Sequence, residues 1–178
     1  LPYKPKRRTK ATIAKERGLE PLAKQIWDSK CNNPKQVAKD FLKHAEIKNT
    51  DEALEGARHI IAEIINEKAE LRTDLRKLFK VDAVITSKVV KSKKEQAEKF
   101  KDYFEWDEKL KNIASHRLLA LRRGENEGFL KLDISPDQDR ALSTIKRNYP
   151  KLNYSCFLEV ELAGKDAYKR LMKPSLET

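Results

Sequence analysis

The sequence predicts a mainly α-helical protein, a multi-helix bundle that carries one or two short β-strands. The 178 residues include only five glycines and are rich in Lys, Glu, Leu and Ala, which favour helices over sheets. Apolar residues recur every three or four positions over much of the chain, which is the spacing of one buried helix face. Charged residues make up 38% of the chain, above the usual value of about 25%, so we expect a highly charged helical surface.

The beginning of the chain predicts an extended segment followed by short helices. Two prolines among the first five residues exclude a helix there. Thr9 can cap a helix that ends at Gly18, and apolar residues at helical spacing predict a second helix over 20–29. Asn33 followed by Pro34 predicts the start of a third helix, because proline at the first helical position loses no hydrogen bond.

A long apolar stripe begins at Thr50, and it fits either one long helix or two helices. We favour a break near Asn66, because asparagine is a poor helix former that can cap the helix after it. The side chains expected to be buried are Leu54, Ile61, Ile64, Leu71, Leu75 and Leu78.

The middle of the chain is less clear. Residues 81–90 fit a helix by spacing and a strand by their β-branched content, so both remain open. A helix is expected over 93–104, and Asp107 is expected to cap a short helix. Ser115 is expected to cap a further helix that stops at Gly124.

The last third contains the best strand. Phe129–Ile134 alternates apolar and polar residues, which predicts a β-strand. Ser135 and Pro136 then have the order of a helix cap and a first helical residue. Phe157–Leu162 alternates like a strand, but its apolar residues also fit a helix that continues past Gly164, and periodicity does not decide between them.

The net charge of +11 is concentrated in two segments. Residues 1–15 contribute +6 and residues 76–101 contribute +6, whereas 16–75 contribute −2 and 102–178 contribute +1. Such concentration is typical of a surface that binds anions, and a nucleic acid held this way is bound weakly and without sequence preference. Tyr3 adds a ring that could stack on an unpaired base. The candidate nucleic-acid-binding residues are Tyr3, Lys4, Lys6, Arg7, Arg8, Lys10, Lys91, Lys93 and Lys94.

No arrangement typical of an enzyme, a cofactor site or a metal site occurs in the sequence. His44, His59 and His116 are far apart and none stands in a zinc-binding frame. Cys31 and Cys156 lack a partner motif and are interpreted as structural thiols. No apolar run is long enough to span a bilayer and no signal peptide is visible, which predicts a soluble intracellular protein.

Four stretches of the sequence resemble the Tex family of bacterial transcription accessory proteins. They occur in the family's order and extend over the whole chain. The stretches are LPYKPKRRTKATIAKERGLEPLA at the start, KFKDYFEWDEKL at 99–110, SHRLLALRRGENEGFLKL at 115–132 and RLMKPSLET at the end. Glu125 departs from the family pattern, because relatives often carry a basic residue at this position. An acidic residue there weakens the hypothesis that the glycine-containing turn at Gly124 binds phosphate.

The resemblance implies that the chain is a fragment of a longer cytoplasmic bacterial protein. An RNase H-like domain without a working nuclease site, helix-hairpin-helix units and an OB-type RNA-binding domain would follow it. The resemblance also implies a helix over Phe157–Met172 and a helix-turn-helix-like arrangement. The expected organisation is a basic arm and first short helix at 1–18, a helix-turn-helix-like bundle at 19–80, and a second helical part at 81–178 that contains the strand at 129–134 and packs on the first.

Together these observations predict a non-catalytic helical scaffold that assists RNA or DNA binding in transcription regulation. The alternative is a protein-interaction scaffold that docks its sister domains or the transcription machinery and contacts no nucleic acid. The two differ in salt dependence, because phosphate contacts weaken steeply with salt and apolar docking does not.

Overall fold

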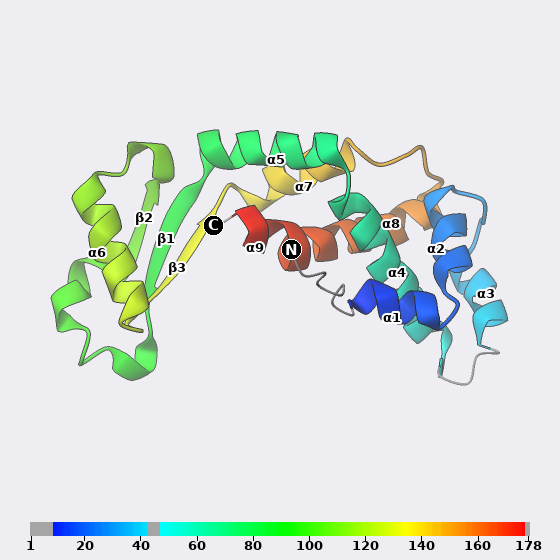
Figure 1. Ribbon diagram of the computed structural model, residues 1–178, viewed down its shortest axis with the longest axis horizontal. Helices are drawn as coiled ribbons and strands as arrows, with labels where there is room; N and C mark the ends of the chain where they lie inside the picture. Colours follow the sequence, from blue (N-terminus) through cyan, green and yellow to red (C-terminus); the bar gives the residue numbers. More distant parts are fainter. Residues whose placement is uncertain (1–8, 43–46, 177–178) are drawn as a thin grey trace, which may run out of the picture. The chain divides into compact units, whose positions relative to one another are not determined.

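The computed structural model describes residues 9–42 and 47–176 (Figure 1). Its α-helices are α1 (Lys10–Glu16), α2 (Glu20–Trp27), α3 (Pro34–Ala38), α4 (Thr50–Asn66), α5 (Ala69–Asp82), α6 (Ser115–Asn126), α7 (Gln138–Lys146), α8 (Tyr154–Asp166) and α9 (Lys173–Leu176). Its strands are β1 (Val84–Val89), β2 (Glu105–Lys109) and β3 (Leu130–Ser135). Shorter 3₁₀ segments lie at Lys39–Phe41, Lys91–Lys93, Glu98–Tyr103 and Leu110–Asn112, and Ala167–Met172 is π-helical. The mainly α class is confirmed, with three short strands in the described part where one or two were expected.

The chain divides into two compact units. The first unit comprises the residues up to Arg72 together with Leu142–Met172, and the second comprises Thr73–Ala141 together with the residues from Lys173 onward. The first unit therefore joins two parts of the chain that are far apart in the sequence. The reason is that α8, late in the chain, returns to pack on α4.

Helix α4 is the centre of the first unit, where it contacts α1, α2, α3 and α8 (Figure 1). The approach of α4 to the α1–α2 connection depends on Gly56, since a Cβ atom there would overlap the side chain of buried Leu19. An ion pair of 2.8 Å between Arg58 Nη1 and Glu159 Oε2 joins α4 to α8. Thr9 and Asn33 cap α1 and α3, as the sequence predicted.

The expected helix break near Asn66 is confirmed, since α4 ends at that residue. The burial predicted for the apolar stripe is only partly confirmed. Leu54, Ile61, Leu71 and Leu75 are buried, but Ile64 and Leu78 are half-buried. The reason is that the buried positions advance mostly in four-residue steps near these two sites, so the inward residues there are Ile65 and Phe79.

The two cysteines meet inside the first unit. Cys31 precedes α3 and Cys156 lies in the first turn of α8, and their sulfur atoms are 3.6 Å apart as free, buried thiols. Asn153 fixes this junction by donating from Nδ2 to the carbonyl oxygen of Cys31 at 2.8 Å. Its backbone N–H also donates to Ser29 Oγ at 2.8 Å. Burial, and then the neighbouring Cys156, raise the pKa of the Cys31 thiol to about 12.

We expect both thiols to be nearly inert in the folded chain. A pKa of about 12 for Cys31 leaves roughly 10⁻⁴ of that thiol as reactive thiolate at pH 8, and burial blocks the reagent at Cys156. Labelling with Ellman's reagent at pH 8 should therefore be very slow in buffer and fast in guanidinium chloride, where two thiols per chain react. Equal rates under the two conditions would contradict this burial.

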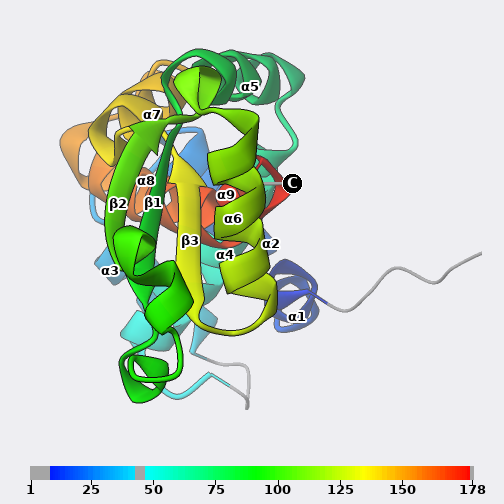
Figure 2. The ribbon, with the colours of Figure 1, turned by 90° about the vertical axis from the view of Figure 1, so that its left-hand side faces the viewer.

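The second unit is built on a three-stranded antiparallel sheet in the order β2-β1-β3. Ile85 pairs with Ile134 of β3 and with Glu108 of β2, so alternate residues from the three strands share one face. Helix α6 lies against β3 beside that face (Figure 2). The buried core residues are Ala83, Ile85, Phe100, Leu121, Leu130 and Ile134.

Two helices expected before α6 were wrong. Residues 93–104 form 3₁₀ turns instead of one helix, because buried Phe100 has non-helical backbone angles that place its ring in the core. Asp107 lies in β2 instead of capping a helix. The segment 81–90, for which helix and strand both remained open, contains β1. The charged sequence of β2 forms a strand because it pairs with β1.

The ends of α6 and the start of α7 also differ from expectation. Ser115 is the first residue of α6 and not its cap, and the helix continues past Gly124. The turn into β3 uses Gly128, whose φ of 80° suits glycine. Ser135 ends β3 instead of capping α7, and its hydroxyl lies 2.7 Å from the carboxylate of Asp133.

The remaining predictions for the last third are confirmed. The strand expected at Phe129–Ile134 is β3. The ambiguous segment from Phe157 is helical through α8 and the π-helical residues, as the family resemblance implied. No helix among the described residues is long and apolar enough to cross a membrane.

Candidate nucleic-acid interface

Five lysines lie at one end of the sheet in the second unit, and we call this group the basic end: Lys88, Lys91, Lys93, Lys94 and Lys131. Lys88 in β1 is the Cα partner of Lys131 in β3. Lys91 and Lys93 form the 3₁₀ turn that follows β1, and Lys94 comes directly after it. All five side chains are exposed. Figure 2 shows the segment after β1 at the same end of the sheet as the α6–β3 turn.

Backbone hydrogen bonds fix the basic end. The N–H of Val90 donates to the carbonyl oxygen of Phe129 at 2.9 Å, which joins the turn after β1 to the turn before β3. The N–H of Lys93 then donates to the carbonyl oxygen of Val90 at 2.9 Å. The ammonium of Lys93 lies over Gly128, where a Cβ atom would be 3.1 Å from its Nζ. Lys91, Lys93 and Lys94 therefore project from a turn that backbone hydrogen bonds fix, beside Lys88 and Lys131 on the strands.

Carboxylates lie near the basic end, and exposed Glu95 directly follows Lys94 in the chain. Lys88 of β1 also faces Glu105 of the neighbouring strand β2. None of the five lysines forms an ion pair with a described residue. Glu127, the acid in the nearby turn, is instead paired with Lys99 at 2.8 Å. Like charges opposite each other in a sheet are unfavourable, so the Lys88–Lys131 pair would be stabilised by a bound anion such as a phosphate.

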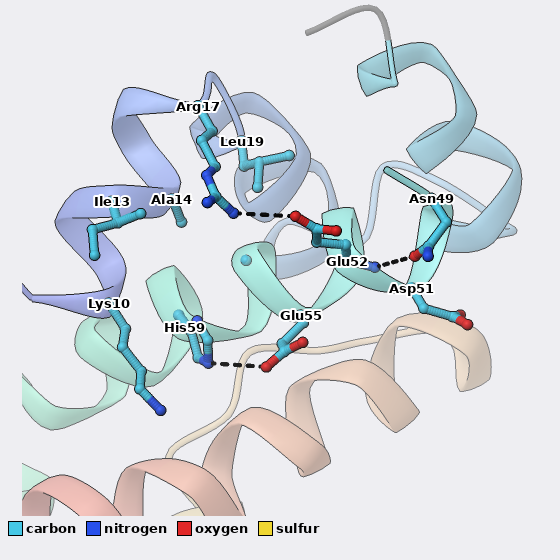
Figure 3. Close-up of a pocket in the computed structure, with 11 residues that line it drawn as sticks. Lys10, Ile13, Ala14, Arg17, Leu19, Asn49, Asp51, Glu52, Glu55 and His59 are labelled. Atoms are coloured by element: carbon cyan, nitrogen blue, oxygen red, sulfur yellow. Dashed lines mark hydrogen bonds and ion pairs between the residues drawn. The ribbon is translucent and has the colours of Figure 1, made fainter. Parts of the chain in front are cut away.

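Of the other predicted residues, only Lys10 lies in the described part of the chain. Lys10 lies in α1 of the first unit, where it lines a different pocket (Figure 3). Tyr3, Lys4, Lys6, Arg7 and Arg8 lie outside the described residues. Sequence reasoning missed Lys88 and Lys131. They could have been found by predicting that 84–89 and 129–134 are neighbouring strands. The sequence left 81–90 open between helix and strand, so this pairing could not be predicted.

The pocket beside Lys10 lies between α1 and α4 and has a volume of about 510 Å³ (Figure 3). Carboxylates of Asp51, Glu52 and Glu55 line it from the first turns of α4. Arg17 Nη1 contacts Glu52 Oε1 at 3.3 Å. The acidic lining makes the pocket a poor site for phosphate.

The same pocket contains His59, whose Nε2 lies 3.9 Å from Glu55 Oε1 (Figure 3). Burial, and then the nearby charge of Arg170, lower the pKa of this imidazole despite the carboxylates of Asp166 and Glu55. Burial and Arg170 thus favour the neutral form of His59. No group of three or more His, Cys, Asp or Glu side chains within 9–42 and 47–176 is arranged to hold a metal ion.

The model of the Tex central region-like family matches residues 29–172. The chain belongs to the Tex family. The matched residues include α3 to α8 and the whole sheet, so the basic end lies within the family's central region.

Curated relatives of this Tex-family chain come from several bacteria. It is 43% identical over 139 residues to the protein YhgF of Escherichia coli. This alignment covers 77% of this chain and 18% of YhgF. It is 41% identical over 144 residues to the protein tex of Bordetella pertussis, covering 80% of this chain and 18% of that one. The transcriptional accessory protein Tex of Neisseria gonorrhoeae is 40% identical over 152 residues, covering 85% of this chain and 20% of that protein. The chain thus spans about a fifth of these relatives.

Proposed function

We propose that the chain is a non-catalytic helical scaffold of a transcription accessory factor, and that it assists nucleic-acid binding with its basic surfaces. The observation that carries the proposal is the basic end, where two strands and a turn present five exposed lysines together. The relative from Neisseria gonorrhoeae is named a transcriptional accessory protein, which supports a role in transcription. Since the relatives are bacterial, we expect the chain to act in the cytoplasm.

Lysines suit this role because each ammonium neutralises a phosphate without reading a base. Affinity then comes from released counterions, and it falls as salt rises. In the proposed mechanism the basic end and the segment from Tyr3 to Lys10 hold the backbone of RNA or DNA weakly. An OB-type domain elsewhere in the full-length protein would supply most of the affinity, and the RNase H-like and helix-hairpin-helix units would be further partners of this scaffold.

Replacing the five lysines of the basic end by alanine should weaken binding to all nucleic-acid sequences alike. Each lost phosphate contact should flatten the plot of log K against log salt by about 0.9 on duplex DNA, so the whole change is at most about 4.5. Fluorescence anisotropy with a labelled duplex at several salt concentrations measures both the affinity and the slope.

A matched control removes the same charge from the first unit. Lys24, Lys30, Lys35, Lys39 and Lys48 are exposed and lie outside the basic end, so their replacement by alanine should leave most of the slope unchanged. Equal loss in the two variants would mean that only total charge matters, and this would refute a localised interface. Circular dichroism should first show that both variants are folded.

The second candidate function is a protein-interaction scaffold that docks sister domains or the transcription machinery. It is favoured by Leu119, a large apolar side chain of α6 that is 70% exposed. Binding of a partner through such a surface should depend little on salt, which separates it from the first proposal.

A further inference from the structure

A second surface of the sheet unit lies at the end opposite the basic end. It is a groove of about 400 Å³ between the C-terminal half of α5, α6 and the sheet. Ala83 precedes β1, Leu110 follows β2 and Ile134 lies near the end of β3, so the groove is open at the edge where these three strand ends meet. The apolar residues that line it are Phe79, Ala83, Leu110, Leu118, Ile134 and Leu176.

Three cations surround this apolar floor, and no acidic residue of the described part of the chain lines the groove. Arg76 and Lys80 come from α5, and Arg122 comes from α6. All three are exposed. Arg122 pairs with Glu125 at 2.8 Å on its own helix, whereas Arg76 and Lys80 have no ion pair with a described residue.

The pair on α5 is unfavourable in the isolated chain. Arg76 and Lys80 are four residues apart and therefore neighbours on one helix face, where like charges destabilise a helix. A carboxylate placed between them would reverse the sign of this interaction. The rim of the groove is thus complementary to an acidic partner.

One exposed leucine of α6 stands near the groove in the sequence of that helix. Leu119 directly follows Leu118 of the groove lining and stands three residues before Arg122, so it is a surface neighbour of the rim. At 70% exposure it contributes nothing to the core of the unit. An apolar cleft with a charged rim and an exposed leucine on one of its helices is typical of a protein-binding surface.

We propose that this groove binds an acidic segment of a partner protein, with an apolar side chain on the floor and carboxylates at Arg76, Lys80 and Arg122. A peptide fits these features better than a nucleic acid does. The one aromatic residue of the lining, Phe79, is only 6% exposed, so it offers no ring face on which a base could stack. An amphipathic acidic helix offers both an apolar stripe and flanking carboxylates.

The probe is a fluorescein-labelled helical peptide of about 14 residues, with leucines at i, i+3, i+4 and i+7, a few glutamates flanking this stripe, and alanine and glutamine at the other positions. Its binding to the 178-residue chain is measured by fluorescence anisotropy. The variant Arg76→Glu/Lys80→Glu should bind about tenfold more weakly, which corresponds to roughly 1.4 kcal/mol. Arg122→Glu on the other wall should weaken binding in the same direction. Replacing the leucines of the peptide by alanine should also cost about tenfold or more.

The control is Lys77→Glu, which makes the same charge change as Arg122→Glu but at an exposed residue of α5 that does not line the groove, and it should change affinity less than about twofold. The proposal is overturned if the peptide does not bind at about 1 mM, if a peptide with lysines in place of glutamates binds equally well, or if Arg76→Glu/Lys80→Glu binds as tightly as the unchanged chain. The proposal is also overturned if a DNA duplex displaces the peptide and the affinity of that duplex falls as much as that of the peptide in Arg76→Glu/Lys80→Glu. Such a result would assign the groove to nucleic acid.

Discussion

Replacing Ile61 by alanine should lower the free energy of unfolding by about 2–5 kcal/mol, the range for large deletions in a packed core. Ile61 is fully buried in α4, the helix that α1, α2, α3 and α8 all contact. The shortened side chain leaves a cavity that these helices can fill only in part. Denaturation with urea, followed by circular dichroism, measures the loss.

Ile64 provides the control for this prediction because it lies on the same helix but is only half-buried. The substitution Ile64→Ala makes the same chemical change with less apolar surface removed from water, so its cost should be clearly smaller. A loss below about half a kcal/mol for Ile61→Ala, or equal losses at the two sites, would contradict the packing of α4 described above.

Replacing Gly124 by alanine should destabilise the sheet unit by about 1–3 kcal/mol, the usual cost of overpacking a core. Alanine favours a helix over glycine by about 1 kcal/mol, so helix propensity alone predicts the opposite sign. The added Cβ atom would lie 2.8 Å from Cγ and 3.4 Å from Cβ of buried Leu130. Thermal unfolding of the variant reveals which effect is larger.

A double-mutant cycle tests the cause. Leu130→Ala removes the side-chain atoms that the added Cβ atom would overlap, so Gly124→Ala should cost less in the Leu130→Ala background than in the unchanged chain. If the cost is the same in both backgrounds, or if Gly124→Ala stabilises the chain, Gly124 is not needed for the approach of α6 to β3.

Local signals in the sequence were enough to predict most helices. Thr9 and Asn33 were read correctly as caps because a cap depends only on its own helix start. The break at Asn66 was predicted because asparagine is a poor helix former, but Asn66 ends α4 and does not cap α5, which begins at Ala69. Gly124 was misread as a helix stop, because the sequence cannot distinguish a glycine that ends a helix from one that lets a strand approach.

Features that depend on distant residues could not be predicted. Glu105–Lys109 is rich in residues that disfavour strands, and it becomes β2 only because it pairs with β1. The basic end was found only in part for the same reason. Lys91, Lys93 and Lys94 form a visible run, whereas Lys88 and Lys131 join them through a strand register that no local pattern shows.

The most direct test of the proposed function is a binding titration of this chain with labelled duplex DNA, single-stranded DNA and RNA at about 50 and 200 mM salt. If Lys4, Lys6, Arg7, Arg8 and Lys10 each contact a phosphate, they contribute a slope of log K against log salt of about −4.5 on duplex and about −3.5 on single strands. We expect weak binding, with Kd of about 10⁻⁴–10⁻⁶ M, that weakens steeply between the two salt concentrations. Replacing these five residues by alanine should flatten the slope for every sequence. No binding at the lower salt concentration, or binding that is unchanged at the higher one, would contradict a phosphate-binding scaffold and favour the protein-interaction function instead.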